Sequence, residues 1–536
     1  MDSQALCSRA AAFHRAGDLA SAERLYREAA EVAAFTPRYL LGVVYFQQRR
    51  YEDALKWIDA ALAIDPRVSE ALNISGLVLQ ALERHEEALA RFAAALAVEP
   101  GCIEAWNNHG VALQHLGRPE EALVSYDRAL AGAPENGEIW DNRGVALREL
   151  GLFEEALASF DHSLMANPHI ARAWNNRGLV LHDMGRVEES LASYDRAIAI
   201  DPRHIDALWN RGLAALQLGR FDEGWPLYEW RLRRPDIAGP RTCDKPRWTG
   251  HEEIAGETLL VCSEQGFGDT IQFCRYAELA AAKGARVILS VHDALVPLIS
   301  SLGAGIKIVG ESAKPPPFDR YIPLLSMPLA FGTTAQNIPV QIPYLAPEPL
   351  RVKRWKSRIG TAGFRVGISW QGGSRGRAAA GRGFPLAAFE GLAAIPGVRL
   401  VSLQKKDGLD QLDDIPPQMA VETLGDDFDV GDDAFLDTAA AMKCLDLVIT
   451  SDTAIAHLAG ALGRPVWVGL QFVPDWRWQL ERSDSPWYPT MRLFRQQARR
   501  HWQSVFSAME ETLRALTLQA PSTSPRSRTP SPSRDL

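Results

Sequence analysis

Residues 105–134 read AWNNHGVALQHLGRPEEALVSYDRALAGAP, and this stretch contains every mark of a unit that recurs through the first half of the chain. Its glycine and its final proline each return at a constant interval. The recurring residues are Gly42, Gly76, Gly110, Gly144, Gly178 and Gly212, together with Pro66, Pro100, Pro134, Pro168 and Pro202. A fixed period in the range of about 20 to 50 residues predicts a solenoid in which one structural unit is stacked many times.

The unit has five marked positions, which in this stretch are Trp106, Gly110, Ala122, Tyr126 and Pro134. Small residues allow two helices to approach closely, and the proline follows the second helix, where the chain stops being helical. This spacing resembles the tetratricopeptide repeat (TPR), in which each unit is a pair of antiparallel helices. The resemblance predicts an α-superhelix over residues 1–234, with a degenerate capping repeat at 8–36.

A row of asparagines stands at one point of successive first helices. Its members are Asn108, Asn142, Asn176 and Asn210. First helices line the concave face of such a superhelix, and an amide both donates and accepts hydrogen bonds, so this ladder is expected to hold the backbone of an extended peptide. The arrangement resembles the repeat domain of O-GlcNAc transferase, where an asparagine ladder contacts the acceptor protein. The alternative is that these asparagines only serve helix packing and solubility.

From Thr258 onward the sequence changes to short apolar runs separated by helical segments. The runs cover residues 258–262, 286–291, 306–309, 320–324, 365–370, 399–403, 445–450 and 465–470. Continuous apolar runs of this length predict parallel strands that are buried on both faces. Residues 343–356 divide the runs into two sets, so we expect two Rossmann-like lobes with a ligand-binding cleft at the carboxyl ends of their strands.

The first run leads into Ser263-Glu264-Gln265-Gly266-Phe267-Gly268-Asp269-Thr270 and then into a helix. A dinucleotide fingerprint would have Gly or Ala where this chain has Ile271, so a nicotinamide dehydrogenase is disfavoured. The expected structure is a glycine-permitted tight turn that brings the helix amino terminus and Asp269 into the cleft. The alternative role of Asp269 is to cap the helix.

The second lobe contains the strongest chemical signal. A buried strand at 445–450 ends in Ser451-Asp452-Thr453, and a helix of small residues begins at Ala454. Free backbone amides and the positive end of the helix dipole then face the cleft, which predicts a diphosphate site. His457 follows one turn into the helix, on the side of Thr453. The alternatives are a capping role for Asp452 and a satisfied core position for His457.

The segment at 445–465 and the Gly268-Asp269 pair resemble the heptosyltransferase-type group of GT-B glycosyltransferases. The resemblance covers residues 257–516. The fusion to repeats resembles bacterial TPR glycosyltransferases and, more distantly, O-GlcNAc transferase. The resemblance implies that Asp269 is the acceptor-side base and that Asp452, Thr453 and His457 bind the donor. Because a carboxylate repels phosphate, a ribose or sugar hydroxyl is the expected ligand of Asp452.

Further donor-binding residues are expected from their positions. They are Gly268, Gln371, Lys405, Ser451 and Ala454. The turn at 369–373 is followed by Arg375, Arg377 and Arg382, which are candidates to cover the phosphates, and Lys405 follows a strand end, where it is either a partner of the leaving diphosphate or a solvated lysine. The acidic residues at 426–433 lie between strands, and GT-B enzymes generally bind the donor without a divalent ion, so no metal or other cofactor is expected.

Composition limits the remaining possibilities. A formal net charge of −8 argues against nucleic-acid binding through a basic face. The stretch from Met1 to Ala30 lacks the apolar core of a signal peptide, no stretch approaches the length of a membrane span, and six cysteines lie far apart, so we expect a cytoplasmic protein. Residues 520–536 consist almost entirely of Ser, Pro, Thr and Arg, which predicts a disordered tail.

The expected organisation is a TPR domain at 1–234, a linker at 235–256, lobes at 257–350 and 351–519, and the tail. The expected function is transfer of a sugar from a nucleotide-sugar to a protein that the repeats recruit. Two alternatives stay open, a non-catalytic TPR scaffold and a transferase that acts on a glycolipid or lipopolysaccharide. The sequence does not identify the sugar, the nucleotide or the acceptor.

Overall fold

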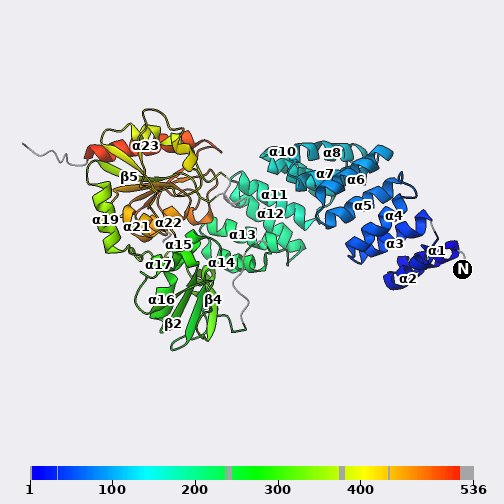
Figure 1. The fold of residues 1–536 in the computed structure, drawn as a ribbon, viewed down its shortest axis with the longest axis horizontal. Coiled ribbons are helices and arrows are strands. Elements are labelled where there is room, and N and C mark those ends of the chain that lie inside the picture. Colours follow the sequence, from blue (N-terminus) through cyan, green and yellow to red (C-terminus); the bar gives the residue numbers. More distant parts are fainter. Residues whose placement is uncertain are drawn as a thin grey trace, which may run out of the picture. The chain divides into compact units, whose positions relative to one another are not determined.

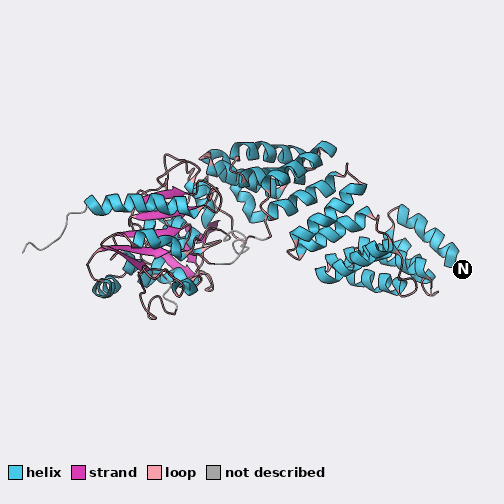
Figure 2. Cartoon of the chain, turned by 90° about the horizontal axis from the view of Figure 1, so that it is seen from above, coloured by secondary structure: helices cyan, strands magenta, loops and turns pink. Residues whose placement is uncertain are grey.

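The computed structural model describes residues 3–32, 34–235, 237, 244–373, 381–431 and 435–519. The chain forms two compact units, Met1–Ala207 and Leu208–Leu536. The first is helical and the second contains both sheets (Figures 1 and 2). The predicted tail at 520–536 lies outside the described residues, as do Arg375 and Arg377.

Unit 1 is a solenoid of helix pairs, which confirms the predicted repeats. Its described helices are α1 (Ser3–Arg15), α2 (Leu19–Ala29), α3 (Phe35–Gln47), α4 (Tyr51–Leu62), α5 (Ser69–Ala81), α6 (His85–Val98), α7 (Ile103–His115), α8 (Pro119–Gly132), α9 (Gly137–Glu149), α10 (Phe153–Ala166), α11 (Ala171–Asp183) and α12 (Val187–Ile200). Consecutive helices pack in pairs, and each pair packs on the next. A further pair, α13 (Ile205–Gln217) and α14 (Phe221–Tyr228), continues the repeat pattern, and the boundary between the units falls within α13.

The recurring glycine is required where the two helices of a pair touch. A Cβ atom at Gly110 would lie 2.6 Å from Cε1 of the buried Tyr126, and one at Gly144 would lie 2.7 Å from Cε1 of Phe160. Such distances are far below van der Waals contact, so any side chain at these positions would separate the helices. The repeat period in the sequence is therefore the period of this helix contact.

The recurring tryptophans join successive pairs. Nε1 of Trp106, Trp140 and Trp174 donates to the carbonyl oxygens of Pro100, Pro134 and Pro168 at 2.8, 2.8 and 2.9 Å. Each bond connects a first helix to a proline that lies two residues beyond the end of the preceding second helix. The tryptophans are partly buried rather than fully enclosed in the core.

Unit 2 contains two parallel sheets, as the sequence predicts. The first has the order β3-β2-β1-β4, and the second has the order β10-β9-β8-β5-β6-β7. The strands are β1 (Thr258–Cys262), β2 (Arg286–Val291), β3 (Ile306–Gly310), β4 (Arg320–Pro323), β5 (Phe364–Ser369), β6 (Val398–Ser402), β7 (Val421–Glu422), β8 (Leu447–Ser451), β9 (Val466–Leu470) and β10 (Met491–Arg495). The register places Ile368 beside Ser402 and Ile449, at the centre of the larger sheet.

Eight of these strands match the predicted runs closely at both ends. The apolar runs did not predict β7 and β10, which lie at opposite edges of the second sheet. β7 has only two residues, and β10 alternates apolar residues with Arg492 and Arg495, so neither contains a continuous apolar run.

Helices cover the sheets of unit 2. They are η1 (Glu229–Arg233), α15 (Phe267–Phe273), α16 (Tyr276–Ala282), η2 (Asp293–Leu295), α17 (Val296–Ile299), η3 (Leu324–Ser326), α18 (Met327–Ala330), α19 (Pro349–Ile359), η5 (Leu386–Phe389), α20 (Glu390–Ala393), η6 (Leu409–Leu412), α21 (Leu436–Met442), α22 (Ala454–Ala461), η7 (Trp476–Trp478) and α23 (Trp502–Gln519). One hydrophobic core extends from the first sheet to the helices of the second lobe. Within the described residues, no helix combines the length and the apolar composition that crossing a membrane requires.

Candidate functional site

The two motifs of the sequence analysis meet in unit 2. Helix α15 follows β1 and helix α22 follows β8, and the two helices pack against each other. A Cβ atom at Gly268 would lie 3.0 Å from Cδ2 of His457 and 3.5 Å from Cα of Ala454. Both helices begin at the carboxyl end of a parallel strand, which is where open α/β sheets bind ligands. The structure therefore brings the predicted base segment and the predicted donor segment into contact.

The turn before α15 differs from the expected one. The positive φ of 62° falls on Gln265, whereas neither Gly266 nor Gly268 has a positive φ. A non-glycine residue in the left-handed region is uncommon and strained. Gly268 is required here for the close approach to His457, not for the conformation of the turn.

Asp269 is held by two partners. The backbone N–H of Gly266 donates to its Oδ2 at 2.9 Å, and Nη2 of Arg477 donates to its Oδ1 at 2.5 Å. The first bond is the helix cap that the sequence analysis gave as the alternative role. The second is an ion pair that connects the first lobe to the loop after β9. The Asp269 side chain stays 19% exposed, so it is accessible to a substrate.

Arg477 is the central cation of this site, and the sequence analysis did not identify it. Its Nη1 pairs with Oδ1 of Asp475 at 2.9 Å, and its Nε donates to Oε1 of Gln272 at 2.7 Å. Burial disfavours its charge, but the attraction of Asp475 and Asp269 outweighs that penalty and raises the pKa of Arg477. This guanidinium is therefore permanently charged.

Asp452 and Asp475, two carboxyls near Arg477, have pKa values that shift in opposite directions. Burial raises the pKa of Asp452, and the positive charge of Arg382 opposes this only in part. Burial also acts on Asp475, but Arg477 outweighs it and lowers the pKa of that carboxyl. Of the two, Asp452 therefore takes up a proton more readily. A protonated Asp452 would repel a phosphate less than a carboxylate would.

The β8–α22 junction leaves polar groups available. Thr453 is the N-cap residue of α22, but its side chain makes no capping bond, and its Oγ1 lies 3.2 Å from Oγ1 of Thr450. Ser451 is fully buried, and its Oγ has no hydrogen-bond partner among the described residues. Buried polar groups are normally satisfied, so each exception needs an explanation. The Thr453 hydroxyl and the first amides of α22 together suit a ligand that is rich in oxygen atoms.

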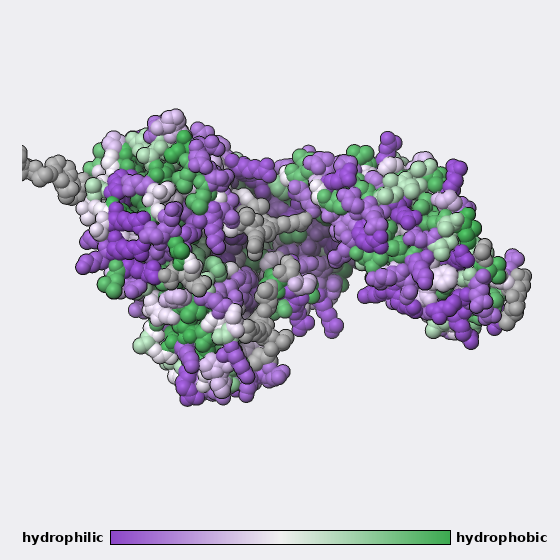
Figure 3. Space-filling model, viewed as in Figure 1, coloured by the Kyte–Doolittle hydropathy of each residue, from purple (hydrophilic) through white to green (hydrophobic). Residues whose placement is uncertain are grey.

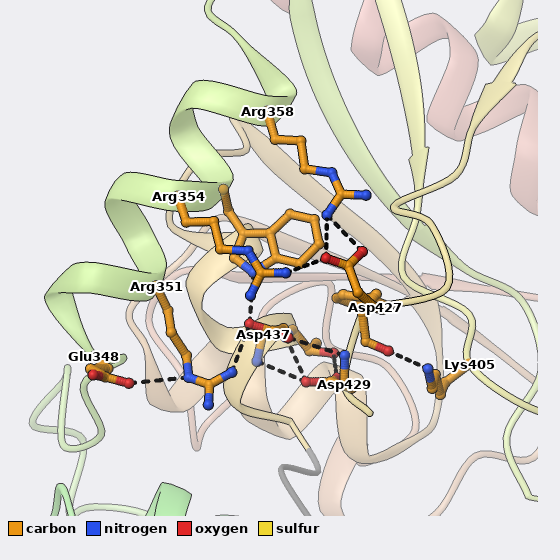
Figure 4. Close-up of polar contacts among 11 residues, drawn as sticks. Glu348, Arg351, Arg354, Arg358, Lys405, Asp427, Asp429 and Asp437 are labelled. Atoms are coloured by element: carbon orange, nitrogen blue, oxygen red, sulfur yellow. Dashed lines mark hydrogen bonds and ion pairs between the residues drawn. The ribbon is translucent and has the colours of Figure 1, made fainter. Parts of the chain in front are cut away.

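Gln371 and Lys405 have protein partners of their own. Oε1 of Gln371 accepts from Nε2 of Gln411 at 3.3 Å, and its backbone is bonded to Gln404. Nζ of Lys405 donates to the carbonyl of Phe428 (Figure 4). In the described part of the chain neither side chain bonds to the β8–α22 junction. Their predicted contacts with the donor stay predictions.

Figure 4 shows the acidic stretch that the sequence analysis considered as a metal site. Asp427 pairs with Arg354 and Arg358 of α19, and Asp429 accepts from the backbone N–H of Asp437 at 2.7 Å, at the start of α21. A hollow of about 460 Å³ lies beside these groups. Within the described residues, which exclude 432–434, the chain has no cluster of three metal-ligating side chains. Asp427 is thus bound to α19, and Asp429 is bound to the start of α21.

The asparagine row serves helix packing, which was the alternative to peptide binding. Nδ2 of Asn108, Asn142 and Asn176 donates to a side-chain oxygen of the preceding repeat, at 3.0, 2.9 and 3.0 Å. The acceptors are Asn73, Asn107 and Asp141. Each bond joins the first helices of consecutive repeats. The side-chain oxygen of Asn142 also accepts from Nη2 of Arg172 at 3.5 Å. Each amide keeps a second N–H that can donate to a peptide, so the ladder stays a prediction beside this structural role.

Two matched variants separate the roles of these amides. Replacing Asn108 and Asn142 with Ala removes two bonds between repeats and the amides that would hold a peptide. Replacing Asn73 and Asn107 with Ala removes the same two bonds but leaves Asn108 and Asn142 in place. We expect similar losses of stability, about 0.5 to 1.5 kcal/mol for each bond. Capture of the acceptor protein in a pull-down should weaken clearly only in the first variant, and equal capture by both would contradict the peptide ladder.

Comparisons with known proteins agree with the repeat unit. Residues 3–68 and 75–138 match a family model described as tetratricopeptide repeat, residues 137–170 match another model of that description, and residues 178–219 match a model described as TPR repeat. Among solved structures, PilW, described as a widely conserved type IV pilus biogenesis factor, is 25% identical, with a TM-score of 0.35 over 37% of this chain and 91% of PilW. YrrB, described as a TPR protein with an unusual peptide-binding site, is 27% identical, with a TM-score of 0.30 over 34% of this chain and 95% of YrrB.

One relative extends beyond the repeats. Protein FlbA of Caulobacter vibrioides is 27% identical to this chain over 315 residues, which are 54% of this chain and 52% of FlbA. The match thus spans about half the length of this curated relative. The matched part, 54% of this chain, is longer than unit 1, which ends at Ala207, so the similarity includes part of unit 2.

Proposed function

We propose that this chain transfers a sugar from a nucleotide-sugar donor to a protein acceptor, with unit 2 acting as a GT-B-type glycosyltransferase. The observation that carries the proposal is the contact between the Gly268-Asp269 segment and the β8–α22 junction. It unites a candidate base with a candidate diphosphate site, although the two segments come from different sheets. The repeats of unit 1 indicate protein binding, which supplies a reason for a protein acceptor.

The donor diphosphate is assigned to the start of α22. The first amides of a helix have no partners within the helix and favour negative charge. Thr453 adds a hydroxyl that caps nothing in the protein. Arg382, which acts electrostatically on Asp452 and Asp475, is the nearby cation suited to the leaving diphosphate.

Asp269 is assigned as the general base. The acceptor hydroxyl gives its proton to the Asp269 carboxylate while its oxygen bonds to the anomeric carbon, and the bond from that carbon to the nucleoside diphosphate breaks. Gly266 and Arg477 use one lone pair on each carboxylate oxygen, and each oxygen has a second. Arg477 thereby orients the carboxylate without blocking it.

The charge of the repeat unit limits its partners. Residues 1–207 contain 31 Asp and Glu against 20 Lys and Arg, a formal net charge of −11, while the whole chain carries −8. Hydrophilic residues cover much of the face of the repeats that Figure 3 shows. Such a surface favours neutral or basic acceptor segments over acidic ones. A non-catalytic scaffold would use the same surface, so donor binding decides between the two functions.

Nucleotide binding tests the donor site. The full chain, with EDTA present, should be thermally stabilised by at least one of UDP, GDP, ADP and dTDP. Thr453→Val should raise the Kd for that nucleotide about 10- to 100-fold, because a hydrogen bond to a charged group is lost. The control Thr512→Val removes a hydroxyl from the exposed face of α23 and should leave the Kd unchanged. Equal affinities of the two variants would contradict the assignment, and stabilisation that disappears with EDTA would contradict a metal-free site.

A further inference from the structure

His457 lies in an aromatic cage at the centre of the site. Its ring stacks on Trp478 with centroids 5.3 Å apart and an interplanar angle of 21°, and it tilts against Tyr488 with centroids 5.8 Å apart. Gly268 closes the opposite side, since a Cβ atom there would lie 3.0 Å from Cδ2 of the imidazole. The ring is 5% exposed. Its orientation is therefore fixed by packing.

A chain of hydroxyl groups determines which ring nitrogen bears a proton. Tyr344 donates its hydroxyl proton to the carbonyl of Ile271 at 2.9 Å, and a carbonyl can only accept. The Tyr488 hydroxyl lies 3.5 Å from that of Tyr344 and 3.1 Å from Nδ1 of His457. The shorter distance favours donation of the Tyr488 proton to Nδ1 over donation to the Tyr344 oxygen. In that arrangement Nδ1 is the acceptor, and the proton of the neutral ring resides on Nε2.

The charges around the ring keep it neutral. Burial, followed by the charge of Arg477, lowers the pKa of His457 to about 3. Arg275 and Arg382 act in the same direction, and Asp475 opposes them. Burial raises the pKa of Tyr488, so this phenol keeps its proton and remains a donor. The ring therefore presents one N–H group without a positive charge.

We propose that Tyr488 is a positioning residue that holds His457 in the Nε2–H tautomer, so that His457 donates one neutral hydrogen bond to an oxygen of the bound donor substrate. The proposal rests on the proposed function for the identity of that ligand. Nε2 has no hydrogen-bond partner among the described residues. The ligand oxygen belongs to a hydroxyl or a phosphate beside the start of α22, since His457 lies in the first turn of that helix. A neutral donor binds such an oxygen equally well throughout the physiological pH range.

The tautomer is measured directly by nitrogen NMR of the full chain carrying ¹⁵N-histidine, with His457→Gln identifying the resonances. We expect an Nε2–H signal, an unprotonated Nδ1 and no titration between pH 5 and 8. Tyr488→Phe keeps the ring that packs against Gly460 but removes the hydroxyl, so a fraction of Nδ1–H should appear. Tyr276→Phe removes a buried hydroxyl that bonds to Thr333 instead and should change nothing. A wild-type His457 that is protonated on Nδ1, or that titrates near 6.5, would overturn the proposal.

A second measurement separates this inference from the proposed function. The Kd for the nucleoside diphosphate that stabilises the wild-type chain should rise about 2- to 10-fold in Tyr488→Phe, because the neutral hydrogen bond from His457 to the ligand is weakened. It should stay constant in Tyr276→Phe. An unchanged Kd beside a changed tautomer would refute the part of the inference that concerns the ligand. Absence of nucleotide binding in the wild-type chain would refute the proposed function, while the tautomer would still be decided by NMR.

Discussion

Replacing Arg477 with Met is expected to destabilise unit 2 by about 3 to 5 kcal/mol, because it leaves two carboxylates without their shared partner. The Arg477 side chain is 8% exposed, and those of Asp269 and Asp475 are each 19% exposed. Little water therefore reaches the Arg477 guanidinium that the two carboxylates share. Hydrogen exchange followed by mass spectrometry measures the opening free energy of peptides from α15 and η7 separately from the repeats. Those peptides should exchange far faster in the variant.

The control is an arginine that pairs with an aspartate at the surface. Arg482 contacts Asp484, and their side chains are 39% and 68% exposed. Arg482→Met should therefore cost less than about 1 kcal/mol. If Arg477→Met destabilised unit 2 no more than Arg482→Met, the central role of Arg477 would be contradicted.

The effect of Arg477→Met also has a predictable pH dependence. Arg477 lowers the pKa of Asp475, so this ion pair contributes its full stability above the unfolded-state value of about 3.9 and loses it as the pH falls through the lower folded-state value. The difference in stability between the wild type and the variant should accordingly shrink in acid. A difference that stayed constant from pH 7 to pH 2 would show that lost packing, not lost charge pairing, causes it.

The second large effect is expected from Asp269→Asn. An amide oxygen at this position still accepts the N–H of Gly266, so the helix cap is retained, but the amide cannot take a proton from the acceptor. Transfer should slow by about 10²- to 10⁴-fold, the usual cost of losing a general base. The Kd for the nucleotide should stay nearly constant, because the diphosphate is assigned to α22. Steady-state transfer rates and nucleotide titration measure the two quantities separately.

Asp475→Asn serves as the control for the ion pair. It disturbs Arg477 as Asp269→Asn does but leaves the carboxylate of Asp269 in place. Its transfer rate should fall much less than that of Asp269→Asn. If the two variants lost equal activity, or if Asp269→Asn lost nucleotide binding together with transfer, Asp269 would be a structural residue.

The sequence predicted two kinds of feature, those that repeat at a fixed interval and those that a short stretch of neighbouring residues determines. The repeat interval reflects the contact between Gly110 and Tyr126, which recurs in every described pair from α5 to α12. Continuous apolar runs predicted eight strands because these strands are buried in parallel sheets. The short motifs at Gly268 and His457 follow two of those strands, so the edge where they meet could be predicted as well.

The sequence did not predict contacts between distant segments that lack a shared pattern. Arg477 and Asp269 are 208 positions apart, and the hydroxyl of Tyr488 reaches His457 from the segment between β9 and β10. Only the fold brings these groups together. The bonds from Asn108 to Asn73 and from Asn142 to Asn107 are a different case, since both partners recur with the repeat. Comparing the asparagines at positions 73 and 107 with those at positions 108 and 142 would have predicted these bonds.

Intact-mass analysis of cellular proteins tests glycosyl transfer to a protein most directly. Three cell populations are compared, one without this chain, one with the wild-type chain and one with Asp269→Asn. If the chain glycosylates proteins, we expect at least one protein to carry an added sugar mass only in cells with the wild-type chain. Identical masses in all three populations, with the wild-type chain present and folded, would contradict transfer to protein.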